Sequence, residues 1–168
     1  VQAFASGVDI HLSRTITCIR DCDKGKCLTD ENGNEYGPFD AVIIAGALET
    51  RTLDQTSWLS SHLNPVRGQI SYIPEELVAK TGERARIKCV LSHKGYITPA
   101  RNGFHVFGAT FGRDDARIDL RDDDHDFNVK QLAKVLPDIA ANLSAQKLDG
   151  RASLRTTTAD HLPVIGPA

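Results

Sequence analysis

The stretch from residue 95 to residue 110, Gly-Tyr-Ile-Thr-Pro-Ala-Arg-Asn-Gly-Phe-His-Val-Phe-Gly-Ala-Thr, contains two strand-like segments with turn-forming residues between them. Residues 95–99 and 104–110 are rich in aromatic and β-branched side chains, as strands are. Two further segments of this kind precede them, at residues 69–73 and 87–91. The four segments together predict an antiparallel meander.

A helical pattern follows the meander. Asp122-Asp123-Asp124 places negative charge at the start of a segment whose apolar residues lie roughly on one side, which is typical of a helix. We interpret the aspartate run as this helix start, in preference to a metal site. Pro137 ends the pattern, a second short helix is expected over residues 139–144, and residues 151–154 return as a strand.

Short β-elements are expected before the meander, at residues 8–12, 15–19 and 26–29, with a turn over residues 30–34. The continuous apolar run Ala41-Val42-Ile43-Ile44-Ala45-Gly46-Ala47 predicts a strand that is buried on both faces, as in a parallel sheet. The polar segment that follows, up to the break at Asn64-Pro65, predicts a short helix.

The composition is that of a soluble globular protein, with 168 residues, 40% hydrophobic and 25% charged. No apolar run is long enough to cross a bilayer, and a cytoplasmic location is expected. The net charge of −2 argues against a protein that coats nucleic acid but leaves room for a local basic patch. The sequence begins with Val1 and contains no methionine, so we expect it to be an internal piece of a longer polypeptide.

The sequence contains no P-loop, no G-x-S-x-G motif and no H-E-x-x-H motif, which sets aside several enzyme classes. Cys18, Cys22 and Cys27 lack the C-x2-C spacing of a zinc knuckle, and the histidines are scattered singly. We therefore expect no metal, and we interpret these cysteines and Cys89 as reduced, structural thiols.

Five motifs occur in order along the chain: Gly46-Ala47, Pro65-Val66-Arg67-Gly68-Gln69, Gly95-Tyr96-Ile97-Thr98-Pro99, Phe107-Gly108-Ala109-Thr110, and Leu154-Arg155 with Asp160-His161-Leu162-Pro163-Val164-Ile165-Gly166. In this order they resemble the FAD-dependent amine and D-amino-acid oxidoreductase (DAO) family, which includes glycine oxidase, over essentially the whole chain. The details are most similar to the C-terminal oxidoreductase domain of the MnmC family of bifunctional tRNA-modification proteins.

The resemblance implies an α/β (α+β) fold with three parts. Residues 1–49 would form part of a Rossmann-like FAD-binding lobe, residues 50–149 an antiparallel substrate domain with one or two helices, and residues 150–168 a return strand and a segment near the flavin. The G-x-G-x-x-G motif of a dinucleotide fold and its acidic ribose partner are not in the sequence. We therefore expect these residues alone to bind FAD weakly or not at all.

The resemblance also implies site residues. Arg155 would hold a substrate carboxylate, because a guanidinium grips a carboxylate with two parallel hydrogen bonds. Its alternative is an ordinary surface arginine at a strand end. Tyr96 would donate a hydrogen bond to the same carboxylate, or its ring packs under the sheet. Arg67 and Gln69 would shape the pocket wall, with Gly68 permitting a close approach.

On the cofactor side, the resemblance implies FAD contacts at Ile16, Ala45, Gly46, Pro163, Val164, Ile165 and Gly166. We expect FAD to be non-covalent, because no cysteine falls in the final segment and His161 is more simply a polar neighbour of the site. S-adenosylmethionine would bind only in a methyltransferase domain elsewhere in the polypeptide.

The implied substrate is the carboxymethylaminomethyl group of a wobble uridine in tRNA, which would yield aminomethyl-uridine and glyoxylate. Two alternatives stay open: an oxidase of free glycine or D-amino acids, and a module that is not catalytic when isolated. A tRNA substrate needs phosphate contacts, and the candidates are basic residues near two adjacent predicted strands. The alternative is that these basic residues form only a solvated face of the sheet. They are Arg84, Arg86, Lys88, Lys94 and Arg101.

Overall fold

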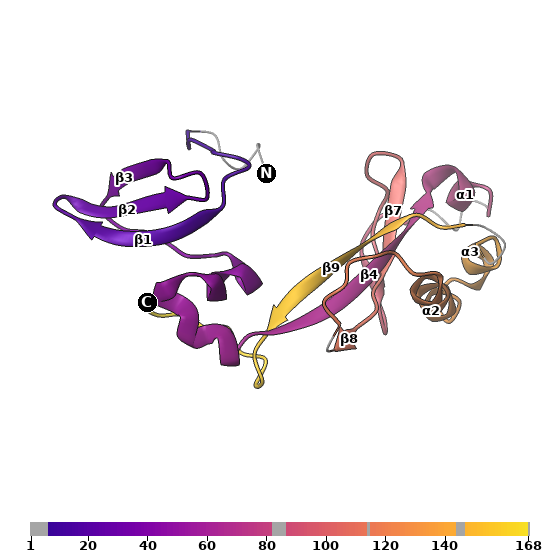
Figure 1. The fold of residues 1–168 in the computed structure, drawn as a ribbon. Coiled ribbons are helices and arrows are strands. Elements are labelled where there is room, and N and C mark those ends of the chain that lie inside the picture. Colours follow the sequence, from indigo (N-terminus) through magenta and orange to yellow (C-terminus); the bar gives the residue numbers. More distant parts are fainter. Residues whose placement is uncertain (1–6, 82–86, 114, 144–146, 168) are drawn as a thin grey trace. The chain divides into compact units, whose positions relative to one another are not determined.

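The computed structural model describes residues 7–81, 87–113, 115–143 and 147–167 (Figure 1). The chain forms two units, residues 1–63 with 158–168 and residues 64–157. The expected mixture of antiparallel sheets with few helices is confirmed. The domain boundaries expected from the sequence, after residues 49 and 149, stay a prediction. Among the described residues, no helix combines the length and the apolar composition needed to span a membrane.

The first unit contains a three-stranded antiparallel sheet in the order β1-β2-β3. Its strands are β1 (Ile16–Cys22), β2 (Gly25–Asp30) and β3 (Glu35–Phe39). The predicted turn between β2 and β3 is confirmed, and the carboxylate of Asp30 holds it together. This carboxylate accepts hydrogen bonds from the backbone N–H of Asn32 and Asn34, both 2.9 Å, and from the Tyr36 hydroxyl, 2.8 Å. These donors, with the Asn34 side chain first among them, lower the pKa of Asp30 to about 2.

The β1–β2 hairpin corrects the interpretation of its cysteines. Cys22 and Cys27 form a disulfide, with their Cα atoms 6.1 Å apart. In the antiparallel register Cys22 lies opposite Gly25 and Arg20 opposite Cys27, so the two cysteines are close across the two strands. The expectation of reduced thiols was therefore wrong for this pair, whereas Cys18 and Cys89 are free.

The strand expected over residues 41–47 is not formed. Residues 41–46 belong to no strand, and the Ile43 side chain is 92% exposed. A strand buried on both faces needs a neighbour on each side, and the part of this unit that the structure describes supplies none. The predicted helix after it appears as two 3-10 helices, η2 (Ala47–Thr52) and η3 (Asp54–Ser61).

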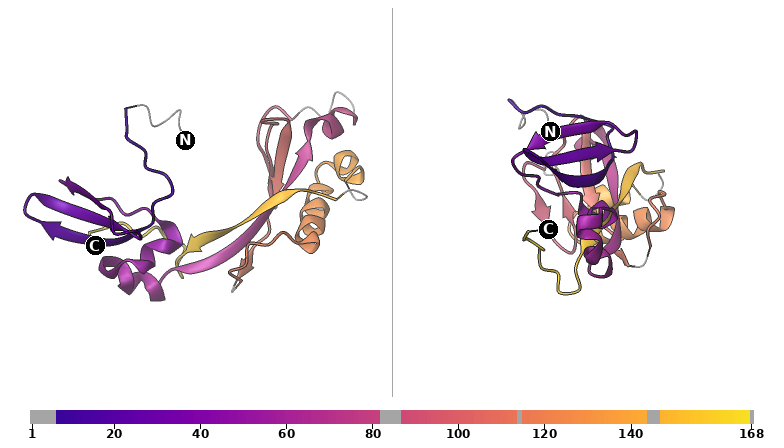
Figure 2. Two further views of the ribbon diagram at one scale, coloured as in Figure 1. Left: turned by 45° about the horizontal axis from the view of Figure 1, so that its top comes forward. Right: turned by 60° about the vertical axis from the view of Figure 1, so that its left-hand side comes forward.

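The second unit is built around the long strand β4 (Asn64–Pro74), which pairs antiparallel with β7 (Phe104–Gly108), β8 (Gly112–Arg113) and β9 (Gly150–Thr157). Strands β6 (Tyr96–Ile97) and β5 (Leu91–Ser92) continue the sheet beyond β7. Strands β4 and β9 run side by side along their length in Figures 1 and 2. The predicted meander is confirmed in part: β5, β6 and β7 pair in sequence order, but β4 pairs with β7 and not with β5. The segment at 87–91 contributes only to a two-residue strand.

Helices cover one face of this sheet. They are α1 (Glu75–Ala79), α2 (Asp122–Leu132) and α3 (Pro137–Ala141), and α2 confirms the helix predicted from the aspartate run. The core between sheet and helices consists of Ile73, Val78, Ile97, Phe107, Leu132, Ile139, Ala140 and Leu143. Because neighbouring side chains of a strand alternate, Arg67, Gln69, Ser71 and Ile73 of β4 point to this helix face.

The remaining side chains of the sheet point the other way, to a face that we call the open face. Residues directly opposite each other in paired strands share a face, so the register of β4 assigns the members on its neighbours. The open face carries Gly68, Ile70, Tyr72, Tyr96, Arg151 and Arg155.

Candidate functional site

Arg155 lies on β9 with its guanidinium above Gly68 of the neighbouring strand. Nη1 donates a hydrogen bond to the carbonyl of Thr110, 3.3 Å, and Cζ lies 4.4 Å from the centroid of the Phe111 ring. A Cβ atom built on Gly68 would be 2.8 Å from Cζ of Arg155, closer than real Cβ contacts. Gly68 therefore permits the close approach of a side chain, and the guanidinium occupies the space that any other residue would fill.

Tyr96 shares the open face with Arg155. Across the sheet, Tyr96 lies opposite Gly108 of β7, and Gly108 lies opposite Ile70 of β4. Ile70 in turn lies opposite Arg151 of β9, four residues before Arg155 and therefore on the same face. With about 4.8 Å between adjacent strands, β6 and β9 are about 14 Å apart across the sheet. The structure thus brings both residues to one face, with β7 and β4 between their strands.

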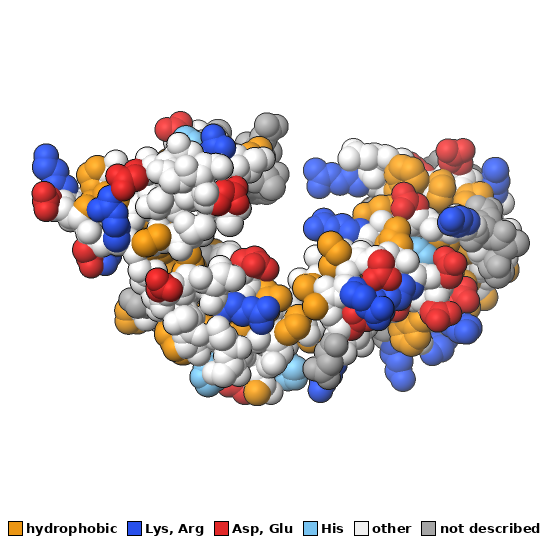
Figure 3. Space-filling view, viewed as in Figure 1, with side chains coloured by type: hydrophobic (Ala, Val, Ile, Leu, Met, Phe, Trp, Pro, Cys, Tyr) orange, Lys and Arg blue, Asp and Glu red, His pale blue; other side chains and the backbone are white. Residues whose placement is uncertain are grey.

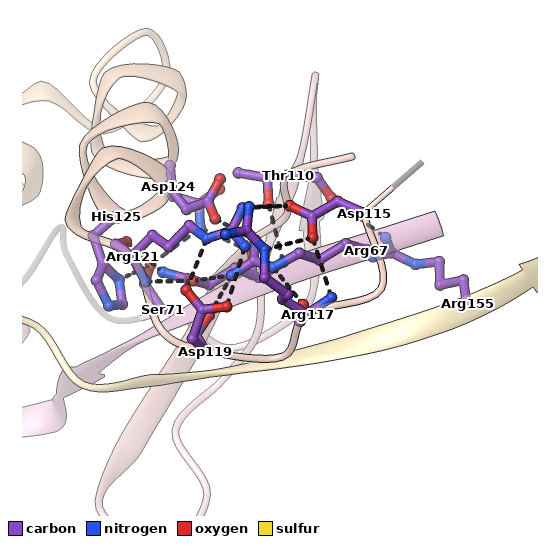
Figure 4. Close-up of polar contacts among 12 residues, drawn as sticks. Arg67, Ser71, Thr110, Asp115, Arg117, Asp119, Arg121, Asp124, His125 and Arg155 are labelled. Carbon is purple, nitrogen blue, oxygen red and sulfur yellow. Dashed lines mark hydrogen bonds and ion pairs between the residues drawn. The ribbon is translucent and has the colours of Figure 1, made fainter. Parts of the chain in front are cut away.

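Arg67 and Gln69 point to the helix face and are buried. Arg67, 2% exposed, donates through Nε to the carbonyl of Arg117, 2.9 Å, and through Nη2 to Oε1 of Gln69, 3.0 Å. Its guanidinium also bonds the carboxylate of Asp124 and the carbonyl of Asp119 (Figure 4). Arg67 and Gln69 therefore tie the segment before α2 to the sheet. Their side chains lie on the helix face, whereas that of Arg155 lies on the open face.

Gln69 connects this buried network to Arg155 through its backbone. Its N–H donates to Oγ1 of Thr110, 3.0 Å, and its carbonyl accepts from the N–H of Thr110, 3.2 Å. The amide of Asn128 on α2 donates to the same carbonyl, 3.1 Å. Thr110 is thus fixed by β4 on one side and bonds Arg155 with its carbonyl on the other. Sequence reasoning placed Thr110 in a motif but did not identify it, or Phe111, as a neighbour of Arg155.

Charged side chains of both signs surround the segment before α2. The guanidinium of Arg121 and, secondarily, that of Arg117 hold the pKa of Asp115 well below its usual range. Arg121 likewise lowers the pKa of Asp119, and the two carboxylates raise the pKa of Arg121. These carboxylates and guanidinium groups therefore pair with one another along the segment.

A buried histidine lies on the first turn of α2. Nδ1 of His125 shares a hydrogen bond with Oγ of Ser71, 2.8 Å. Burial lowers the pKa of His125, and nearby carboxylates oppose this shift. They belong to Asp122, Asp124, Asp149 and Asp126. The histidine points to the helix face, away from Arg155.

The candidate FAD contacts all lie in the first unit. Ile16 begins β1 and is half-buried, whereas Ala45 and Gly46 are exposed just before η2. A Cβ on Gly46 would lie 3.2 Å from Oγ1 of Thr50, so the backbone approaches closely there. Residues 163–166 are exposed and follow a turn in which Oγ1 of Thr158 donates to the carbonyl of Leu162, 2.8 Å.

Near the two segments expected to contact a flavin nucleotide, Ile43 is 92% exposed and Ile165 is 90% exposed, so apolar side chains there would be free to contact a planar ring. A phosphate-binding glycine loop is not in the sequence. The residues present would therefore supply only part of an FAD site.

Of the basic residues considered for phosphate contacts, Arg84 and Arg86 lie outside the described residues, and Lys88, Lys94 and Arg101 are exposed. On the side of the second unit visible in Figure 3, basic side chains stand beside acidic ones.

Comparisons with known proteins agree on one family. The model of the FAD dependent oxidoreductase (DAO) family matches residues 2–168. The tRNA 5-methylaminomethyl-2-thiouridine biosynthesis bifunctional protein MnmC of Chromobacterium violaceum is 41% identical over 142 residues, 81% of this chain and 20% of that protein. The MnmC protein of Aeromonas salmonicida is 31% identical over 169 residues, 99% of this chain and 24% of that protein. The chain thus spans about a fifth to a quarter of these relatives.

Solved structures share the fold. Glycine oxidase from Geobacillus kaustophilus superposes with a TM-score of 0.71 at 21% identity, covering 99% of this chain and 42% of that one. Glycine oxidase from Bacillus cereus gives a TM-score of 0.68 at 21% identity, covering 96% of this chain and 42% of that one.

Proposed function

The chain belongs to the DAO family of FAD-dependent oxidoreductases, and from this premise we propose that it is part of the oxidoreductase domain of a bifunctional tRNA-modification protein. The similarity to MnmC proteins over most of the chain supports this proposal. The rest of the FAD site would be supplied by parts of the same polypeptide outside these residues. A methyltransferase domain that binds S-adenosylmethionine would lie there too, and the protein would work in the cytoplasm, where its tRNA is.

The proposed reaction removes the carboxymethyl group from carboxymethylaminomethyl-uridine at the wobble position of tRNA. When bound, FAD would supply the two-electron oxidation of the substrate, in which the carbon next to the carboxylate loses a hydride and the nitrogen loses a proton. Water then hydrolyses the resulting carbon–nitrogen double bond of the substrate. The nitrogen stays on the uridine as an aminomethyl group, and the two-carbon acid leaves as glyoxylate, a step toward 5-methylaminomethyl-2-thiouridine.

The observation that carries the proposal is the position of Arg155. Its guanidinium stands on the open face, above a glycine that leaves it space, and only one of its donors is bonded by a described carbonyl, that of Thr110. The remaining donors suit two parallel hydrogen bonds to a carboxylate, which would hold the adjacent carbon in a fixed orientation for oxidation. Tyr96 would donate a further hydrogen bond from the same face.

Arg67 and Gln69 would act on the pocket from behind the sheet. They fix Thr110 and the segment before α2, and Thr110 in turn orients Arg155. FAD would be held without a covalent bond, at Ile16, Ala45, Gly46, Pro163, Val164, Ile165 and Gly166.

Glyoxylate released from tRNA that carries the carboxymethylaminomethyl group tests the proposal in the complete FAD-loaded protein. Arg155→Ala is expected to abolish release, because the carboxylate loses its charged partner. Arg151→Ala is the matched control, since Arg151 is an exposed arginine on the same face of the same strand. Equal activity of the Arg155 variant and the control would reject the proposed role.

A second candidate function is oxidation of free glycine or D-amino acids. It is favoured by the same guanidinium, because a free amino acid and the modified uridine present the same carboxylate. Peroxide formed from glycine without tRNA, at a rate exceeding that with the modified tRNA, would support this function in place of the first. The isolated 168 residues are expected to bind FAD weakly or not at all and to show neither activity. Saturable quenching of flavin fluorescence by them would contradict the expected weak binding.

A further inference from the structure

An exposed aromatic ring is held in place beside Arg155. The Phe111 side chain is 73% exposed, so its burial contributes little to folding. Its backbone is nevertheless fixed on both sides. Thr110 is hydrogen-bonded to Gln69, and Gly112 pairs with Arg67 of β4. The position of the ring is therefore set by the hydrogen bonds of the neighbouring backbone and not by burial of the ring itself.

The ring lies on the open face. Gly112 is opposite Arg67, whose side chain points to the helix face, so the preceding residue points the other way. Cζ of Arg155 lies 4.4 Å from the centroid of the ring. This cation–π contact helps to hold the guanidinium over Gly68. With 73% of its surface exposed, the ring still offers a flat apolar surface next to the proposed carboxylate-binding group.

We propose that Phe111 determines specificity by stacking against the pyrimidine ring of the substrate uridine while Arg155 holds its carboxylate. This inference rests on the proposed function. In the proposed substrate, only a methylene, an amine and a second methylene separate the carboxylate from the base, so a base held near Phe111 follows from a carboxylate held at Arg155. Aromatic side chains bind nucleobases by stacking, and a free amino acid has no ring to stack.

The test measures the binding of two unreactive analogues, in which an ether oxygen replaces the amine. These are 5-carboxymethoxymethyl-uridine, which has the base, and ethoxyacetate, which has only the carboxylate arm. Dissociation constants are measured by calorimetry on the complete FAD-loaded protein. Phe111→Ala is expected to weaken binding of the nucleoside about tenfold or more, the scale of base–aromatic stacking, and to weaken ethoxyacetate only slightly.

Two further variants separate stacking from simple packing. Phe111→Tyr keeps an aromatic face and is expected to bind both analogues as the unchanged protein does. Phe111→Leu keeps apolar bulk but no ring and should lose nucleoside affinity as Phe111→Ala does. Phe127→Ala is the control, because Phe127 is also exposed, 45%, but lies on α2.

The outcomes are distinguishable. If Phe111→Ala weakens both analogues equally, or neither, the ring does not read the base and the inference is wrong, while the proposed function stands. If the unchanged protein binds ethoxyacetate but not the nucleoside, the proposed tRNA substrate itself fails, and the inference fails with it. Selective loss of nucleoside binding in the Ala and Leu variants supports both.

Discussion

Replacing Gly68 with alanine should weaken substrate binding without harming the fold. The added Cβ would stand 2.8 Å from Cζ and 3.1 Å from Nη2 of Arg155. Real Cβ atoms essentially never lie within 3.0 Å of a heavy atom in a non-adjacent residue, so the guanidinium must move. Gly68 does not have a left-handed backbone conformation, so alanine suits its place in the strand. The group that yields is therefore the end of a flexible side chain, and the strand stays.

The size of the effect follows from the contacts that move. A hydrogen bond to a charged group contributes about 1.5–3 kcal/mol, and each 1.4 kcal/mol is tenfold in affinity. Displacing the guanidinium should therefore weaken binding of a carboxylate ligand by about 10- to 100-fold. Thermal stability should be unchanged or slightly raised, because replacing glycine where its conformation permits contributes about 0.4–1 kcal/mol.

The assay combines calorimetric titration with ethoxyacetate and thermal denaturation of the complete FAD-loaded protein. Gly112→Ala is the matched control, because its Cβ would lie 3.6 Å from Cβ of Arg67, an ordinary contact, on the strand next to β4. Unchanged ethoxyacetate affinity in the Gly68 variant would show that the guanidinium above Gly68 does not bind the carboxylate. A large loss of thermal stability would also contradict the prediction, because the added Cβ would then have displaced the backbone of β4 and not the guanidinium.

Two other predictions concern the helix face. Arg67→Met should destabilise the protein by about 3–5 kcal/mol, because the Asp124 carboxylate loses its buried partner. The additional change Asp124→Asn should restore part of the lost stability. A melting temperature of Arg67→Met like that of the unchanged protein would contradict this prediction. Burial lowers the pKa of His125 below that of an unfolded histidine, so below about pH 6.5 the unfolded chain binds more protons than the folded chain. The contribution of His125 to the free energy of unfolding is therefore complete above that pH and falls as the pH drops. Denaturant unfolding between pH 7 and pH 5 should therefore show a steeper loss for the unchanged protein than for His125→Gln, and parallel curves would show that the prediction is wrong.

The sequence predicted those elements whose signals are local. The turn after β2 depends on one aspartate that caps its own neighbours, and α2 begins at a run of aspartates, so both could be located from nearby residues. The apolar pattern over residues 41–47 has the composition of a buried strand, but whether it pairs depends on neighbouring strands that composition does not reveal.

The candidate site shows the same division. The motif containing Arg67 and Gln69 was identified, but only the register of β4 shows that their side chains point away from Arg155. Phe111 follows a motif directly, yet its contact with Arg155 depends on β8 and β9 flanking β4 together, a long-range pairing. The disulfide depends on the hairpin register, which also lies beyond the spacing of its cysteines.

Anaerobic reduction of the bound flavin by modified tRNA, followed in a single turnover, tests the central role of Arg155 most directly. We expect rapid loss of the oxidised flavin spectrum in the unchanged protein and in Arg151→Ala. In Arg155→Ala the loss should be at least 100-fold slower, because about two hydrogen bonds to the carboxylate are missing. Equal rates of reduction in all three proteins would show that this guanidinium does not hold the substrate.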